Sequence, residues 1–164
     1  MPSRRTILGA LGATAVSSVV GYRWLNRVTG YVQEKSVEVR YREDDRWHGE
    51  SVITVALNLS AESDQPDLHW LHDDWEDRFE TPHTPVVSDT LHEDLQREYE
   101  TVRYVVGVCS PEWETDEDRI GCRNANVSRA DFNRVQAHDR VKASYDSLGL
   151  SIHDVEGTWS FDER

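Results

Sequence analysis

The chain has 164 residues and a formal net charge of -13, so it is long enough for one domain with a hydrophobic core and carries the wrong charge for a nucleic-acid partner. Apolar, β-branched runs interrupt its acidic stretches, which excludes an intrinsically disordered chain.

The first 25 residues join a basic start to an apolar run. Arg4 and Arg5 are adjacent, and no charged residue follows them between Thr6 and Gly21. This pattern is typical of a targeting segment. The segment resembles a twin-arginine (Tat) export signal, Ser/Thr-Arg-Arg-x-Phe-Leu-Lys, which the chain matches at Ser3, Arg4, Arg5 and Leu8 and departs from at Ile7 and Gly9. The resemblance implies that the Tat translocase recognises Arg4 and Arg5 during export.

The same apolar run has the length of a membrane-spanning helix. Residues 6–25 would form a helix of roughly 30 Å, about the thickness of the hydrocarbon layer. We therefore expect residues 1–27 to be a signal or an uncleaved membrane anchor, residues 28–36 a connector, and residues 37–164 a single exported acidic β-rich domain. The alternative is a cleaved leader and a secreted protein.

The composition of the exported part is acidic and poor in lysine. Residues 1–27 hold four arginines and no acids, which leaves a formal charge of -17 on the remainder, and only Lys35 and Lys142 are lysine. This composition resembles that of proteins from extreme halophiles, notably haloarchaea. At molar salt the Debye length is about 3 Å, so dense carboxylates hardly repel one another. The resemblance implies that the protein works in high salt, and the twin-arginine leader implies that its C-terminal domain lies outside the cell.

The first half of the exported domain is expected to form a hairpin and a helix. Residues 37–42 alternate apolar and polar side chains, and residues 51–59 are mostly alternating and β-branched, so they predict an antiparallel hairpin across a polar turn. Apolar residues then recur at helical spacing from Leu68 to Phe79, which predicts a short amphipathic helix over residues 67–79.

The second half predicts a helix, a central strand and a second hairpin. Ser88 is the expected N-cap of a helix, and residues 102–108 form a nearly continuous apolar run typical of a central strand. The remaining expected elements are a strand at 121–127, a brief helix capped by Ser128, and a hairpin of residues 140–145 and 148–155.

This order of elements predicts an α+β fold that is mainly β. A small five-stranded OB-like barrel and an open antiparallel sheet with one or two short helices both fit it. The barrel is an analogy of fold, and it implies no function.

Cys109 and Cys122 are the two cysteines of the chain. Outside the cell such a pair indicates a disulfide, which would close a loop of about 14 residues and contribute roughly 3 kcal/mol. Two unpaired thiols and a two-cysteine metal site are the alternatives.

A metal site is the sharpest chemical hypothesis that the sequence offers. On the expected helix, His69, His72 and Asp73 would share one face and could bind zinc or a harder cation, and apart from such a metal we expect no cofactor. The alternative is an acidic, solvated helix face that happens to contain histidines.

Other candidate sites are weaker. Trp47 and Trp113 lie in polar segments, where exposed indoles could stack on a sugar or another apolar ligand, although tryptophans more often anchor cores and loops. Asn58 and Asn126 each begin an Asn-x-Ser triplet and are candidate glycan acceptors.

No catalytic signature stands out in the sequence. Gly-x-Ser-x-Gly, His-Glu-x-x-His, Cys-x-x-Cys and phosphate-binding glycine loops do not occur. We therefore expect a membrane-anchored cell-surface domain with a binding or structural role rather than an enzyme. The alternative is a metal-binding protein or metal-dependent enzyme built on the His/Asp cluster.

Overall fold

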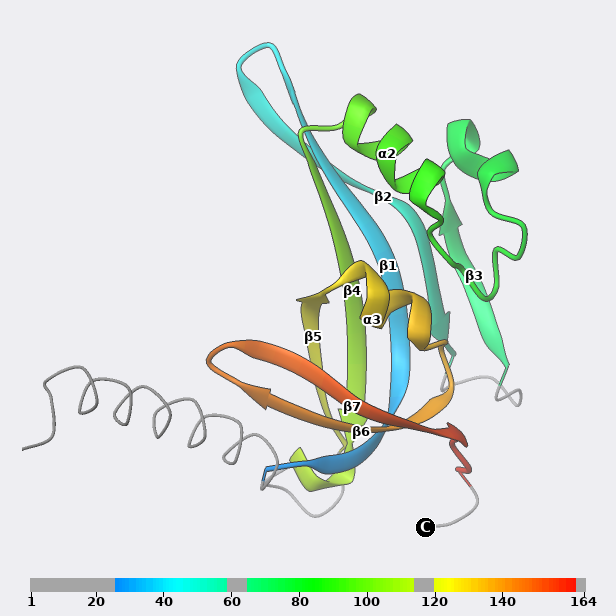
Figure 1. Ribbon diagram of the computed structural model, residues 1–164, viewed down its shortest axis with the longest axis vertical. Coiled ribbons are helices and arrows are strands. Elements are labelled where there is room, and N and C mark those ends of the chain that lie inside the picture. The colour runs from blue at the N-terminus through cyan, green and yellow to red at the C-terminus, as the bar shows by residue number, and fades with distance from the viewer. Residues whose placement is uncertain (1–25, 59–64, 114–119, 162–164) are drawn as a thin grey trace, which may run out of the picture.

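The structure, a computed structural model, describes residues 26–58, 65–113 and 120–161. Seven antiparallel strands form one curled sheet (Figure 1). The strands are β1 (Val28–Glu43), β2 (Arg46–Leu57), β3 (Pro66–Leu71), β4 (Thr101–Ser110), β5 (Gly121–Val127), β6 (Asp139–Asp146) and β7 (Gly149–Thr158). The helical elements are α2 (Asp89–Glu98), α3 (Arg129–Arg134) and the 3-10 segments η1 (Asp73–Arg78) and η2 (Pro111–Trp113).

The long strand β1 organises the sheet. The strand order in the sheet is β3-β2-β1-β4-β5, with β1 at the centre. On one edge of β1, residues Val28 to Tyr31 pair with β6, and residues from Glu34 onwards pair with β2. The expectation of a connector at residues 28–36 is therefore wrong. This segment lacks simple alternation because Tyr31 and Val32 are both fully buried, and the register against β4 shifts between Val32 and Glu34.

The two faces of the sheet differ. The sheet curls into a half-barrel, and α2, α3 and the β6–β7 hairpin all lie over its concave face (Figure 1). The core fills this face with inward residues of the strands, such as Val37 and Val39, and with Leu91 and Leu95 from α2 and Phe132 from α3. We call the opposite side the outer face, and no helix in the described part of the chain covers it.

The expectation of a mainly β, α+β fold is confirmed, and the sheet is a seven-stranded half-barrel rather than a five-stranded barrel. The hairpin expected from residues 37–42 and 51–59 is present in β1 and β2, and the one expected after residue 140 in β6 and β7. The serine caps are confirmed too, because Ser88 Oγ accepts from Leu91 N at 3.1 Å and Ser128 Oγ from Asp131 N at 3.0 Å.

The prediction of a helix over residues 67–79 is wrong. Its first part is β3, which pairs with β2 so that Leu68 lies opposite Val55, and its second part is the short segment η1. The helical spacing of the apolar residues still brings Trp75 and Phe79 into the core. The open edge of β2 offered more hydrogen bonds than an isolated short helix, so strand pairing overrode the local pattern.

A second, smaller apolar cluster lies at the start of β1. Tyr31, Leu57 and Cys109 form its buried centre, and Ile120, Trp159 and Phe161 pack against it. The rings of Trp159 and Phe161 lie 5.3 and 5.0 Å from the ring of Tyr31. The tail after β7 thus packs back onto the beginning of the sheet.

Candidate functional site

The structure separates the residues of the expected metal site. His69 lies on β3, whereas His72 precedes η1 and its Nδ1 accepts a hydrogen bond from Asp74 N at 3.2 Å. The other ring nitrogen of His72 is 3.9 Å from Oε1 of Glu50. In residues 26–58, 65–113 and 120–161, no group of three or more His, Cys, Asp or Glu side chains is placed to hold a metal ion. The shared helical face on which the zinc prediction for His69, His72 and Asp73 depended does not exist.

The cysteines form a disulfide, as expected. Cys109 on β4 and Cys122 on β5 are direct register partners, and their sulfurs are bonded. Cys109 is fully buried in the cluster around Tyr31, so the bond ties the edge strand β5 to the second core.

The two candidate tryptophans differ in exposure, and both candidate glycosylation sites are exposed. Trp113 is half-buried and packs edge-on against Tyr145, so it is a loop anchor. Trp47 keeps 59 % of its surface exposed. Asn58 and Asn126 are both exposed, and their glycosylation stays a prediction.

A tight turn decides which face of the sheet Trp47 joins. Asp44 and Asp45 both have positive φ, 48° and 62°, as a two-residue hairpin turn requires. The turn fixes the register that pairs Glu43 with Arg46 and Arg42 with Trp47. Because a shift of one residue would send every side chain to the other face, this turn places Trp47 on the outer face.

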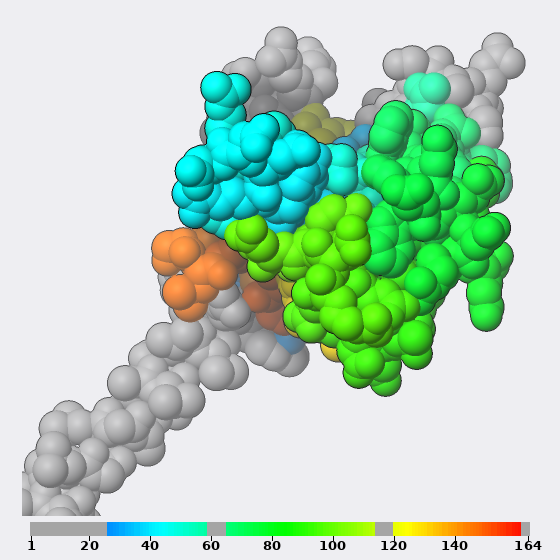
Figure 2. Space-filling view, turned by 90° about the horizontal axis from the view of Figure 1, so that it is seen from above, coloured from blue at the N-terminus to red at the C-terminus, as the bar shows by residue number. Residues whose placement is uncertain are grey.

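The same register assembles a group of side chains on the outer face near the hairpin tip. Arg40 lies opposite Gly49 on β2 and opposite Thr101 on β4, and Glu38 lies opposite Ser51 and Arg103. In Figure 2, which looks down on the tip, α2 and its neighbours (green) lie against only one side of the hairpin (cyan).

Gly49 leaves a hollow in this group. A hollow of about 420 Å³ is lined by Arg40, Trp47, His48, Gly49, Thr101 and Arg103. A neighbouring hollow of about 370 Å³ shares Arg40, Gly49 and Arg103 with it and adds Glu38 and Ser51. We call the two together the outer-face groove. Although His48 borders the groove, its ring stacks on Tyr41, which belongs to the opposite face.

The groove holds two guanidinium groups that the rest of the described chain does not neutralise. The guanidinium of Arg42 pairs with Asp45 at 3.1 Å, whereas the guanidinium groups of Arg40 and Arg103 have no ion pair or hydrogen bond within the described ranges. In a chain with a formal charge of -13, two unpaired arginines side by side are unexpected, because a carboxylate is easily found nearby.

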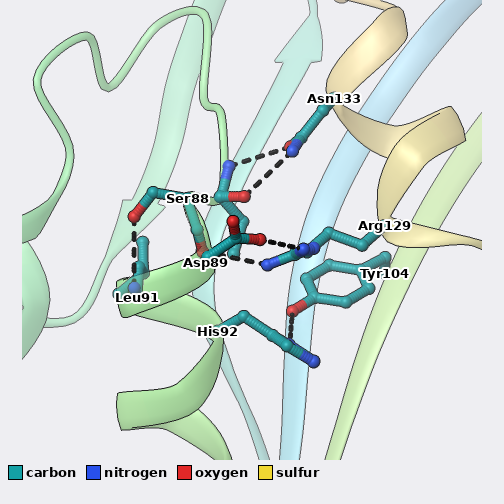
Figure 3. Close-up of polar contacts among 8 residues, drawn as sticks. Ser88, Asp89, Leu91, His92, Tyr104, Arg129 and Asn133 are labelled. Carbon is teal, nitrogen blue, oxygen red and sulfur yellow. Dashed lines mark hydrogen bonds and ion pairs between the residues drawn. The ribbon is translucent and has the colours of Figure 1, made fainter.

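A polar cluster on the concave side has a different role (Figure 3). His92 Nδ1 is 2.6 Å from the hydroxyl of Tyr104, and burial raises the pKa of Tyr104, partly opposed by Arg129. Tyr104 therefore keeps its proton, and the tautomer of His92 decides which of the two groups donates this hydrogen bond. The guanidinium of Arg129 reaches Ser88 O at 3.1 Å and the carboxylate of Asp89.

Asn133 completes that cluster. Its side chain accepts from Val87 N at 2.8 Å and donates to Val87 O at 2.9 Å. These contacts join α2, α3 and β4, and Tyr104 is only 6 % exposed. The cluster is a structural connection, and the outer-face groove is the candidate site.

Sequence reasoning named Trp47 but missed Arg40, Gly49 and Arg103. The signal that would have found Arg40 and Gly49 is the Asp44-Asp45 pair, read as a two-residue turn that sets the register. Arg103 could not be found this way, because the pairing of β4 with β1 depends on contacts distant in sequence.

In the described residues, no helix is both long and apolar enough to cross a membrane. The expected anchor at residues 6–25 lies outside the described residues, as do Arg4 and Arg5. A scan against models of protein families finds no match, a search of curated proteins finds none, and a search of solved structures finds none.

Proposed function

We propose that this chain is an exported, membrane-anchored cell-surface domain that binds an anionic ligand in the outer-face groove and is not an enzyme. The observation that carries the proposal is the pair of unpartnered guanidinium groups, Arg40 and Arg103, beside the exposed indole of Trp47. Arginine forks match oxyanions such as carboxylates through two parallel hydrogen bonds.

The extracellular setting has separate support. The disulfide between Cys109 and Cys122 is of the kind that persists in oxidising compartments. The acidic, lysine-poor composition suits a solvent of high salt, and the Arg4-Arg5 leader suits export through the Tat translocase to the cell surface.

A titration with a simple carboxylate tests the binding site. Acetate replaces chloride at constant ionic strength while the arginine Nε–Hε signals of the full-length chain are followed by NMR. We expect saturating shifts at Arg40 and Arg103 and none at Arg46, an exposed arginine at the hairpin turn. Arg46→Gln, the matched control, should retain the shifts, and the double variant Arg40→Gln/Arg103→Gln should abolish binding. Equal responses at all three arginines would overturn the proposal.

A second experiment tests the route of export. Replacing Arg4 and Arg5 by lysine keeps the charge but removes the twin-arginine motif, which a receptor reads. The double-lysine precursor should remain in the cytoplasm, as measured by protease protection in intact cells. Normal export of this variant would contradict the Tat assignment and would leave the groove proposal to its own test.

A further inference from the structure

The outer-face groove has a charge balance that restricts its ligand. Two positive side chains, Arg40 and Arg103, and one negative side chain, Glu38, line the two hollows from outer-face positions. Glu50 also borders the second hollow, but it lies opposite Val39 and its carboxylate faces His72 on the other side of the sheet. No ion pair joins Glu38 to either arginine in the described part of the chain. The groove therefore carries one net positive charge, and it complements a ligand, or a repeating unit of a ligand, with one negative charge.

Trp47 supplies an apolar surface at one end of the groove. It lies two residues from Gly49 on the same strand, so its side chain and the hollow above Gly49 share a face. An indole that is 59 % exposed offers a flat face to the weakly polar C–H side of a ring. The anion therefore belongs to a ligand that also carries a ring.

Neutral hydrogen-bonding groups complete the lining. Thr101 and Ser51 contribute hydroxyls, and Glu38 contributes a carboxylate that only accepts hydrogen bonds. A ligand that satisfies Glu38 must bring donors, such as hydroxyl groups. A polyanion such as a nucleic acid would place phosphates against Glu38 and against the acidic surface of the chain.

We infer that the outer-face groove binds an acidic sugar, a hydroxylated ring with a single carboxylate, with the ring on Trp47 and the carboxylate between Arg40 and Arg103. The inference rests on the proposed function and narrows its ligand from any anion to an acidic saccharide. In molar salt the long-range attraction is screened within about 3 Å, so stacking provides most of the affinity and the arginine contacts select the carboxylate.

Calorimetric titration of the full-length chain tests the inference, with trigalacturonate as the acidic sugar and galactotriose as its neutral counterpart. Trigalacturonate should bind at least about tenfold more tightly than galactotriose. Adenosine monophosphate, which combines a ring with a doubly charged phosphate, should bind more weakly than trigalacturonate. Tighter binding of the nucleotide, or equal binding of the two sugars, would overturn the inference.

Variants locate the binding and separate it from folding. Trp47→Ala should weaken trigalacturonate binding at least about tenfold, whereas Leu148→Ala, which removes an exposed apolar side chain at the β6–β7 turn, should change it less than about twofold. Gly49→Val should fill the groove without altering charge. A Cβ at Gly49 has no neighbour closer than 3.7 Å, so the strand accepts it. Undiminished binding by a folded Gly49→Val variant would overturn the inference.

The outcome with acetate distinguishes the two levels of the proposal. If acetate shifts Arg40 and Arg103 but trigalacturonate binds no more tightly than acetate, the groove is an anion site and the saccharide inference is wrong. If neither compound perturbs the groove, the proposed function is wrong as well.

Discussion

Lys35 is a fully buried cation near the middle of β1. Its Nζ donates to Pro85 O at 2.8 Å and to Gln136 Oε1 at 2.9 Å, and it lies 4.1 Å from the centre of the Phe132 ring. Among the residues that the structure describes, no carboxylate contacts it. Burial lowers the pKa of Lys35 to about 7, and the more distant charge of Asp139 acts in the opposite direction. The ammonium group thus connects β1, α3 and the segment before α2 at an energetic cost.

This cost gives the stability of the protein a defined pH dependence. Between pH about 7 and about 10 the unfolded chain keeps a proton on Lys35 that the folded chain has lost, so the free energy of unfolding rises with pH in that window. The full effect is at most about 5 kcal/mol. Below pH about 7 both states are protonated, and the penalty is constant. Urea unfolding at constant high salt, from pH about 7 to about 9.5, measures this rise in the free energy of unfolding.

Lys35→Met is the matched variant, because it keeps the length of the side chain and removes its titration. Its free energy of unfolding should change less with pH in the same window, so the free energy of unfolding of the wild type minus that of the variant should increase steadily with pH. The window ends below pH 10 because burial raises the pKa values of Tyr99 and Tyr104, whose ionisation then lowers stability. Parallel pH profiles for the two proteins would show that Lys35 titrates normally when folded.

Gly30 on β1 lies so close to the backbone of β4 that a side chain at this position would clash with it. A Cβ at this position would lie 2.3 Å from the carbonyl oxygen of Cys109, and backbone atoms have little room to move. Gly30→Ala should lower the free energy of unfolding by more than about 2 kcal/mol. Gly49→Ala is the control, with its nearest neighbour at 3.7 Å, and should be neutral or slightly stabilising. Similar midpoints of thermal unfolding for the two variants would contradict this view of Gly30.

At the scale of elements, local signals were sufficient for some parts of the fold. The helices α2 and α3 follow from Ser88 and Ser128, whose capping bonds lie within each helix's first turn. The β1–β2 and β6–β7 hairpins follow from alternation on both sides of a short turn. In each case the partners are close in sequence, so the sequence pattern carries the information.

Other elements depend on partners that are distant in sequence. The start of β1 pairs with β6 more than a hundred residues later, and β3 replaces a helix only because β2 has an open edge. The groove combines both situations, since Trp47 and Arg40 meet across one turn whereas Arg103 arrives with β4. The sequence alone therefore indicated Trp47 but did not indicate the positive charge that Arg40 and Arg103 give the groove.

The disulfide should hold β5 to the sheet. The double variant Cys109→Ala/Cys122→Ala should lower the free energy of unfolding by about 3 kcal/mol, as expected for a closed loop of this length. Urea unfolding of the variant and of the reduced wild type should agree, because both lack the cross-link. Thiol counting on unfolded, unreduced protein should give none, and two titratable thiols would contradict the bond.

For the whole molecule, net charge is the dominant property. Residues 28–164 carry a formal charge of -17, and the described ion pairs sit at the surface, where each contributes little. In molar salt the carboxylates hardly repel one another, whereas at about 0.1 M the screening distance lengthens to about 10 Å. Repulsion among them then opposes the compact state.

Salt should therefore control folding reversibly. We expect the melting temperature, followed by circular dichroism and tryptophan fluorescence, to fall steeply as salt decreases below about 1 M and to recover when salt returns. Lowering the pH at low salt should restore part of the structure, because protonated carboxylates no longer repel. A melting temperature that is equal at about 0.1 M and about 3 M would show that the acidity does not serve solvation in salt.

The position of β1 also has a mechanical consequence. Load applied through the residues before Val28 enters the molecule along its central strand. β6 lies between β1 and β7, and the start of β1 and the end of β7 lie at opposite ends of it, next to Ala143 and Asp139. A pull between the two ends of the chain shears these strands past one another and loads many backbone hydrogen bonds together. A domain built this way withstands a pull between its two ends for a time set by its unfolding rate rather than by its equilibrium stability.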